Sequence, residues 1–195
     1  MKKIFALFAL TAALTGLSTG AGATPVLIGE IFHDYGSASG KLDPGGNDPL
    51  SADYVTVKDN STSRFNDVFD FSTFDYTSID HFEVTLNFTQ TNGSFESWRA
   101  RPGASTSLPA LSKVGDVLTS QTFSFGPSTD TFASFLSTEK FNLWFAEEGF
   151  GTNDFRLFDA KVSVFGTAAT VPEPGTLGML FLGIAMMVLT SRRRC

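Results

Sequence analysis

His81-Phe82-Glu83-Val84-Thr85-Leu86-Asn87-Phe88-Thr89 is the stretch that decides the fold class. Apolar residues at positions 82, 84, 86 and 88 alternate with polar residues. A period of two places successive side chains on opposite faces of a β-strand, so one face of this strand is apolar and the other is polar. The stretch therefore predicts a strand that packs one face against a core.

The same alternation recurs on both sides of this strand. It is clear at 158–164 and 141–145, and further candidate strands are 54–57, 65–71, 121–125 and a weaker one at 132–136. The runs Asp43 to Asp48, Thr91 to Ser94 and Arg101 to Gly103 are rich in turn-forming residues. No segment shows a sustained helical period with caps. Many short strands predict an all-β fold, a β-sandwich of jelly-roll or immunoglobulin-like type.

The N-terminal end is typical of a secretory signal peptide, which predicts that residues 1–23 are removed. Lys2 and Lys3 precede an apolar run from Ile4 to Leu14, and Ala21-Gly22-Ala23 supplies small residues for cleavage before Thr24. The alternative is an uncleaved N-terminal anchor, for which the apolar run is short. The predicted exported domain is residues 24–170.

The C-terminal end contains a second apolar segment, which predicts a single transmembrane helix at 177–190. At ~1.5 Å per residue, the apolar part from Leu177 to Leu189 covers about 20 Å of a ~30 Å hydrocarbon core. Arg192, Arg193 and Arg194 follow it and form a positively charged stop, which predicts a cytoplasmic end and an exported domain. A buried C-terminal core helix is the alternative, which the flanking arginines and prolines disfavour.

Charge and composition limit the function of the predicted exported domain. It contains 19 acidic and 9 basic residues, a formal net charge of −10, which excludes nucleic-acid binding and favours cations or cationic partners. It contains no cysteine, because the only one is Cys195, so no disulfide can stabilise it. Eighteen phenylalanines predict an aromatic core that replaces disulfides.

Val171-Pro172-Glu173-Pro174-Gly175, followed by the apolar helix and the arginine cluster, resembles the PEP-CTERM sorting signal. The resemblance covers Val171 to Arg194, and Cys195 after the arginines departs slightly from it. It implies a Gram-negative protein that passes through the inner membrane, is held there transiently, and is then processed by an exosortase near the Pro-Glu-Pro motif. It also implies a final place on the cell surface or in the extracellular matrix, in a host that makes exopolysaccharide. The two prolines keep the backbone around Glu173 extended, as a protease substrate requires.

The exported domain shows no catalytic residues in its sequence. It contains two histidines, His33 and His81, and no motif that would activate a serine. Two distant histidines do not supply a zinc site. Paired carboxylates for a glycosidase are expected by chance among 19 acidic residues. We therefore predict a protein that is not an enzyme.

Two acidic groups are candidate sites for structural calcium, since carboxylate and amide oxygens are the ligands this cation prefers. The first lies in a glycine-containing turn, and its alternative is an Asx-type turn without a metal. The second lies around residues 65–74, and its alternative is a solvated strand face; neither group has EF-hand spacing. Their members are Asp43, Asn47 and Asp48 in the first group, and Asp67, Asp70, Asp75 and Asp80 in the second.

Trp98, beside Arg99 and Arg101, is the candidate sugar contact, with core packing as its alternative.

The sequence thus predicts a non-enzymatic surface or matrix protein with a structural or adhesive role associated with exopolysaccharide or biofilm. Its predicted partners are signal peptidase, an exosortase and exopolysaccharide. The alternatives are a calcium-dependent carbohydrate-binding module and a polysaccharide hydrolase.

Overall fold

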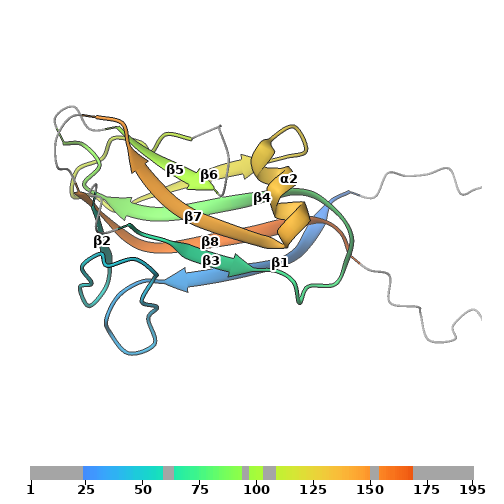
Figure 1. Cartoon of the computed structure of the whole chain (residues 1–195), viewed down its shortest axis with the longest axis horizontal. Helices are drawn as coiled ribbons and strands as arrows, with labels where there is room; N and C mark the ends of the chain where they lie inside the picture. Colours follow the sequence, from blue (N-terminus) through green and yellow to red (C-terminus); the bar gives the residue numbers. More distant parts are fainter. Residues whose placement is uncertain (1–23, 59–63, 94–96, 103–108, 150–153, 169–195) are drawn as a thin grey trace, which may run out of the picture.

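The computed structural model describes residues 24–58, 64–93, 97–102, 109–149 and 154–168, which form eight strands and one helix (Figure 1). In chain order the elements are β1 (Val26–Asp34), β2 (Val55–Lys58), β3 (Asp67–Asp70), β4 (Tyr76–Thr89), β5 (Trp98–Pro102), β6 (Thr119–Phe125), α2 (Asp130–Thr138), β7 (Lys140–Glu147) and β8 (Asp154–Ala168). The all-β prediction is confirmed. The predicted strands at 54–57, 65–71, 82–88, 121–125, 141–145 and 158–164 correspond to β2, β3, β4, β6, β7 and β8.

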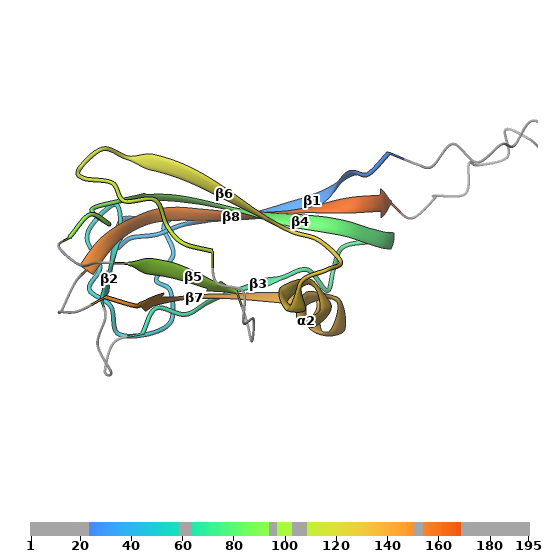
Figure 2. The ribbon, with the colours of Figure 1, turned by 90° about the horizontal axis from the view of Figure 1, so that it is seen from above.

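The strands form two antiparallel sheets that lie in two layers (Figure 2). The larger sheet has the order β1-β8-β4-β6, with β2 also paired to β8, and the smaller has the order β3-β7-β5. At the centre of the larger sheet, Phe82, Val84 and Leu86 of β4 lie opposite Val164, Val162 and Ala160 of β8. The strand that decided the fold class therefore lies in the middle of the larger sheet.

The core between the sheets is aromatic, as the composition predicts. Phe82, fully buried on β4, packs against Phe125, against Phe132 and Phe135 of α2, and against Phe141 of β7 at ring-centroid distances of 4.8–6.4 Å. Pairs of this kind add stability beyond the apolar area they bury. The buried phenylalanines are Phe65, Phe69, Phe71, Phe82, Phe88, Phe125, Phe132, Phe135, Phe141 and Phe155.

The weak strand predicted at 132–136 is wrong, because these residues belong to α2. Phe132 and Phe135 are both buried, and a three-residue spacing puts two side chains on the same face of a helix but on opposite faces of a strand. The side chain of Thr129 caps the helix by accepting a hydrogen bond from the Phe132 N–H. Glu139 ends it in the left-handed conformation, with φ of 54°.

Two strands, β1 and β5, were not predicted, and the predicted turn at Arg101 and Pro102 is the end of β5. In β1 the apolar residues Val26 and Leu27 are both exposed, so apolar and polar residues do not alternate regularly along this strand. Proline is tolerated at Pro102 because β5 is the last strand in the order of its sheet.

The ends of the domain lie together. Val26 at the start of β1 pairs with Gly166 near the end of β8, and both strands leave the domain on the same side, where α2 also lies (Figure 1). β2 lies at the opposite end of the sheets (Figure 2). The described part of the chain contains no helix whose length and apolarity would suffice to cross a bilayer. The predicted signal peptide and the predicted helix at 177–190 lie outside the described residues.

Candidate functional sites

The predicted sorting residues lie just beyond the last described strand. β8 ends at Ala168, and the described residues end with it. The sorting motif Val171 to Gly175 and the membrane stop Arg192 to Arg194 therefore lie outside the described residues. The motif follows the domain after only two residues, so it is joined to the central strand of the larger sheet by a very short connection.

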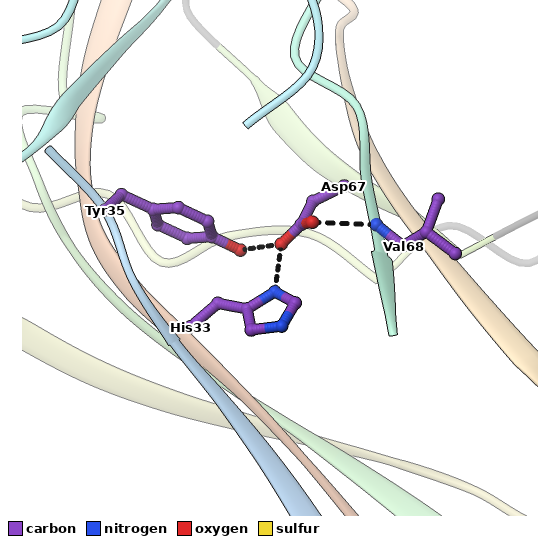
Figure 3. Close-up of polar contacts among 4 residues, drawn as sticks. All are labelled: His33, Tyr35, Asp67 and Val68. Carbon is purple, nitrogen blue, oxygen red and sulfur yellow. Dashed lines mark hydrogen bonds and ion pairs between the residues drawn. The ribbon is translucent and has the colours of Figure 1, made fainter. Parts of the chain in front are cut away.

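A polar cluster joins the two sheets at His33, Tyr35 and Asp67 (Figure 3). Asp67 is on β3, and its Oδ2 atom accepts a hydrogen bond of 2.6 Å from the Tyr35 hydroxyl. His33 of β1 places its Nδ1 atom 2.6 Å from the same oxygen. The Oδ1 atom of Asp67 accepts from the backbone N–H of Val68 at 2.8 Å. The Asp67 carboxylate thus accepts hydrogen bonds from three groups, and those from His33 and Tyr35 link β3 to the larger sheet.

The cluster is largely shielded from water, which strengthens its hydrogen bonds. Tyr35 is fully buried and Asp67 is 7% exposed. Burial, and next the charge of Asp67, raise the pKa of Tyr35 well above its ordinary value, so its hydroxyl stays a donor. His33 also stacks on Phe69 at 4.3 Å between ring centroids. Sequence reasoning missed this cluster because Asp67 is more than thirty positions from His33 and Tyr35.

The second predicted calcium group is not gathered into one site. Asp67 is buried on the inner face of β3, whereas Asp70 lies on the outer face and Asp75 is exposed in the loop that follows. Asp70 is 2.9 Å from the Lys140 ammonium and accepts from the Ser72 N–H at 3.0 Å. Hydrogen bonds from Ser72 first, and then from Lys140, lower the pKa of Asp70 to about 2.

The first predicted calcium group is partly exposed to solvent. Asp43 and Asn47 are exposed, whereas Asp48 is half-buried and its Oδ1 atom accepts from the Lys58 N–H at 3.2 Å. Burial raises the pKa of Asp48. Its Oδ2 atom is buried, with no hydrogen-bond partner in the described structure. Among the residues that the structure describes, no three histidine, cysteine or carboxylate side chains are grouped closely enough to hold a metal ion.

A hollow of about 530 Å³, here called the basic hollow, lies at the β2 end of the domain. Its volume falls within the ~300–1,000 Å³ that is typical of small-ligand sites. It is lined by residues of β2, β5 and β7 and of the segment before β3: Val57, Lys58, Arg64, Phe65, Trp98, Arg101, Trp144, Phe145, Ala146 and Glu147. A smaller hollow of about 300 Å³ shares Arg64, Phe65 and Trp144 with it.

The two tryptophans of the basic hollow differ in exposure. Trp98 is only 2% exposed, and its ring packs 4.7 Å from that of Phe155 in the core. The exposed ring that the predicted sugar contact at Trp98 requires is therefore not present, because β5 points Trp98 inward and Arg101 outward. Trp144 on β7 lies opposite Arg101 and is half-buried, with the Arg101 guanidinium 4.7 Å from its ring centroid.

Two polar atoms in the basic hollow are buried without a hydrogen-bond partner in the described structure. They are Nε of Arg101, a donor, and Oε2 of Glu147, an acceptor. The other oxygen of Glu147 accepts from the backbone N–H groups of Gly149 at 2.7 Å and Ser97 at 3.3 Å. The Glu147 carboxylate is thus fixed in place with one oxygen left over.

The plan of the chain is that of an exported protein with a C-terminal sorting signal: a two-sheet β domain, a Pro-Glu-Pro segment, an apolar run and three arginines. A family model described as the PEP-CTERM protein-sorting motif matches residues 170–194. The chain therefore carries a PEP-CTERM sorting motif, and the predicted resemblance is confirmed. The motif indicates an extracellular protein that an exosortase sorts.

Comparison with solved structures gives distant similarities for the domain. No curated protein matches the sequence. The N-terminal CBM22-1–GH10 modules of Clostridium thermocellum endo-1,4-beta-D-xylanase 10B, complexed with xylohexaose, match with 9% identity and a TM-score of 0.37; the match covers 76% of this chain and 27% of that chain. The Tobacco streak virus coat protein matches with 11% identity and a TM-score of 0.31, over 82% of this chain and 99% of that one.

Proposed function

We propose that this protein is a non-enzymatic component of the cell surface or extracellular matrix, delivered by exosortase sorting, whose β domain contacts exopolysaccharide in a structural or adhesive role. The observation that carries the proposal is the sorting motif at residues 170–194. The motif follows β8, the last strand of the domain, directly in the sequence. Cleavage of the tail therefore decides whether the domain stays attached to the membrane.

The charges at the two ends support the same topology. A signal peptide at residues 1–23 directs export, and Arg192 to Arg194 stay on the cytoplasmic side because arginine crosses a membrane only at high cost. The helix predicted at 177–190 is short for a permanent anchor, which suits temporary retention in the inner membrane before cleavage. The domain is then released from the membrane on its outer side.

The strand order supports the jelly-roll among the two sandwich types expected from the sequence. In this arrangement the first strand pairs with the last, and strands that follow one another lie mostly in opposite sheets. β1 pairs with β8, and the chain changes sheet at each step from β3 to β4, β4 to β5, β5 to β6 and β7 to β8. Backbone bonds of Pro109 and Leu111 to β5 extend the smaller sheet by a short additional segment.

Cell fractionation tests the sorting. The protein carries an epitope tag just after the predicted cleavage site and is compared with two variants. One lacks residues 170–195, and the other has alanine in place of Pro172, Glu173 and Pro174 but keeps the helix and the arginines. We expect the unaltered protein in the surface or matrix fraction, the alanine variant uncleaved in the inner membrane, and the truncated protein free in the periplasm.

Two results would contradict the proposal. One is the unaltered protein in the cytosol with residues 1–23 attached. The other is an alanine variant that fractionates and is cleaved like the unaltered protein. Mass spectrometry of the mature protein provides the matching check, since residues beyond Gly175 should be missing. Assay of the purified protein against the exopolysaccharide of its host tests the non-enzymatic role, and release of shorter saccharides would contradict it.

A further inference from the structure

The basic hollow has the opposite charge to the domain that surrounds it. Three of the nine basic residues in segment 24–170, Lys58, Arg64 and Arg101, line it, compared with one of the nineteen acidic residues, Glu147. Arginine remains protonated at any pH at which the protein is folded. A local positive field in a domain of net charge −10 favours an anionic ligand at the basic hollow.

The two unpartnered atoms specify what such a ligand must offer. A buried donor or acceptor without a partner destabilises the protein, so structures seldom keep one without a reason. Nε of Arg101 requires an acceptor, and Oε2 of Glu147 requires a donor. A ligand that carries anionic oxygens and hydroxyl groups offers a partner of each kind.

The walls of the basic hollow add an aromatic surface. Trp144 lines both this hollow and the smaller one beside it, and Phe65 also belongs to both. Aromatic rings bury apolar surface at little entropic cost, and the C–H face of a sugar ring is apolar while its edge carries hydroxyl groups. An anionic sugar therefore matches the aromatic wall and the charged and polar groups together.

The position of the basic hollow keeps it accessible when the tail is anchored. Val57, which lines the hollow, pairs with Phe155 near the start of β8, whereas the sorting motif follows Ala168 at the other end of this strand. At ~3.3 Å per residue, β8 separates the two by about 40 Å. The hollow is thus far from the point at which the domain is attached.

We propose that the basic hollow binds acidic polysaccharide, with the carboxylate of a uronate unit held by Arg101 and Arg64 and a sugar hydroxyl donating to Glu147. This inference rests on the proposed function, because it names the class of exopolysaccharide that the domain contacts. The ligand is anionic, and a sugar carboxylate is one of the anionic groups to which a guanidinium binds with two parallel hydrogen bonds.

Calorimetric titration of the purified exported protein tests the site. The probes are an oligogalacturonate, the same oligosaccharide with its carboxyl groups reduced to alcohols, and a sulfated oligosaccharide of similar length. Loss of a charged hydrogen bond corresponds to a loss of affinity of about tenfold or more, so Arg101→Gln and Arg64→Gln should each weaken oligogalacturonate binding by that factor. Lys113→Gln removes the same charge from an exposed position that does not line the hollow, and should change affinity less than twofold.

Binding of the oligogalacturonate that depends on Arg101 and Arg64, with weaker binding of the reduced probe, supports the proposal. Equal binding of the reduced probe overturns it, because charge is then irrelevant, and so does an equal loss of affinity in Lys113→Gln. Preferential binding of the sulfated probe overturns the choice of a uronate. Arg64 is exposed, so Arg64→Gln tests the site even if Arg101→Gln fails to fold. Absence of binding while fractionation still places the protein outside the cell removes this site and leaves the sorting intact.

Discussion

Replacing Asp67 by alanine removes the acceptor that joins the two sheets, and its cost can be worked out from the contacts of this carboxylate. The change deletes hydrogen bonds of 2.6 Å from the Tyr35 hydroxyl and from His33. Hydrogen bonds to a charged group contribute about 1.5–3 kcal/mol each, and the fully buried Tyr35 hydroxyl is left without an acceptor. For the two bonds together we therefore expect a loss of about 3–6 kcal/mol.

Urea unfolding followed by tryptophan fluorescence measures this loss as a shift of the unfolding midpoint at constant slope. Tyr35→Phe is the matched variant, because it removes one donor while Asp67 keeps His33 and the Val68 N–H, and it should cost about 1.5–3 kcal/mol, less than Asp67→Ala. Asp75→Ala, at an exposed position, should change stability by less than about 0.5 kcal/mol. If Asp67→Ala costs no more than Tyr35→Phe, the cluster does not join the sheets as described.

Three further changes test other parts of the structure. Thr129→Ala removes the N-cap of α2 and should cost about 1 kcal/mol in urea unfolding, whereas Thr129→Ser, which keeps the hydroxyl, should cost less. The pKa of Asp70 is lowered to about 2 from 3.8, so its contribution to stability is present above about pH 4 and is lost as pH falls toward 2. Asp70→Asn should flatten this part of the pH dependence of the melting temperature, and an unchanged profile would contradict the role of Lys140 and Ser72. Addition of EGTA should leave the melting temperature unchanged, because the described residues hold no group of three carboxylate or histidine side chains close enough for a metal ion, and a fall of several degrees would instead indicate structural calcium.

The strands were predictable where one face of a strand packs on the core and the other meets solvent. In β4, positions 82, 84, 86 and 88 are all buried and the residues between them are not, so the period of two is directly visible in the sequence. The sequence did not predict α2, because the helix is short and aromatic residues such as Phe132 and Phe135 are more typical of strands. Only the spacing of three residues, together with Thr129 before the helix, indicated a helix.

The basic hollow was only partly predictable. The sequence drew attention to Trp98 and Arg101, which do line it. Alternation along β5 divides its residues between two faces, but the sequence alone does not say which face meets the core. Trp98 proved to be the inward residue, and the half-buried tryptophan is Trp144, which lies opposite Arg101 on β7. That pairing joins residues more than forty positions apart and depends on a register that no local pattern specifies.

The stability of the domain and the shape of the basic hollow both depend on contacts between the sheets. No cysteine lies between residues 24 and 170, so the two layers are joined only by packing and polar contacts. Phe82 meets Phe141 beside α2, and Trp98 meets Phe155 beside the basic hollow, so aromatic contacts cross the interface near both ends of the sheets. The Asp67 cluster adds a directional link between β1 and β3. Because β8 supplies Phe155 at one end and leads to the sorting motif at the other, we expect an altered inter-sheet contact near Phe155 to change the shape of the hollow and to leave sorting unaffected, so that the two proposed functions can be separated by mutation.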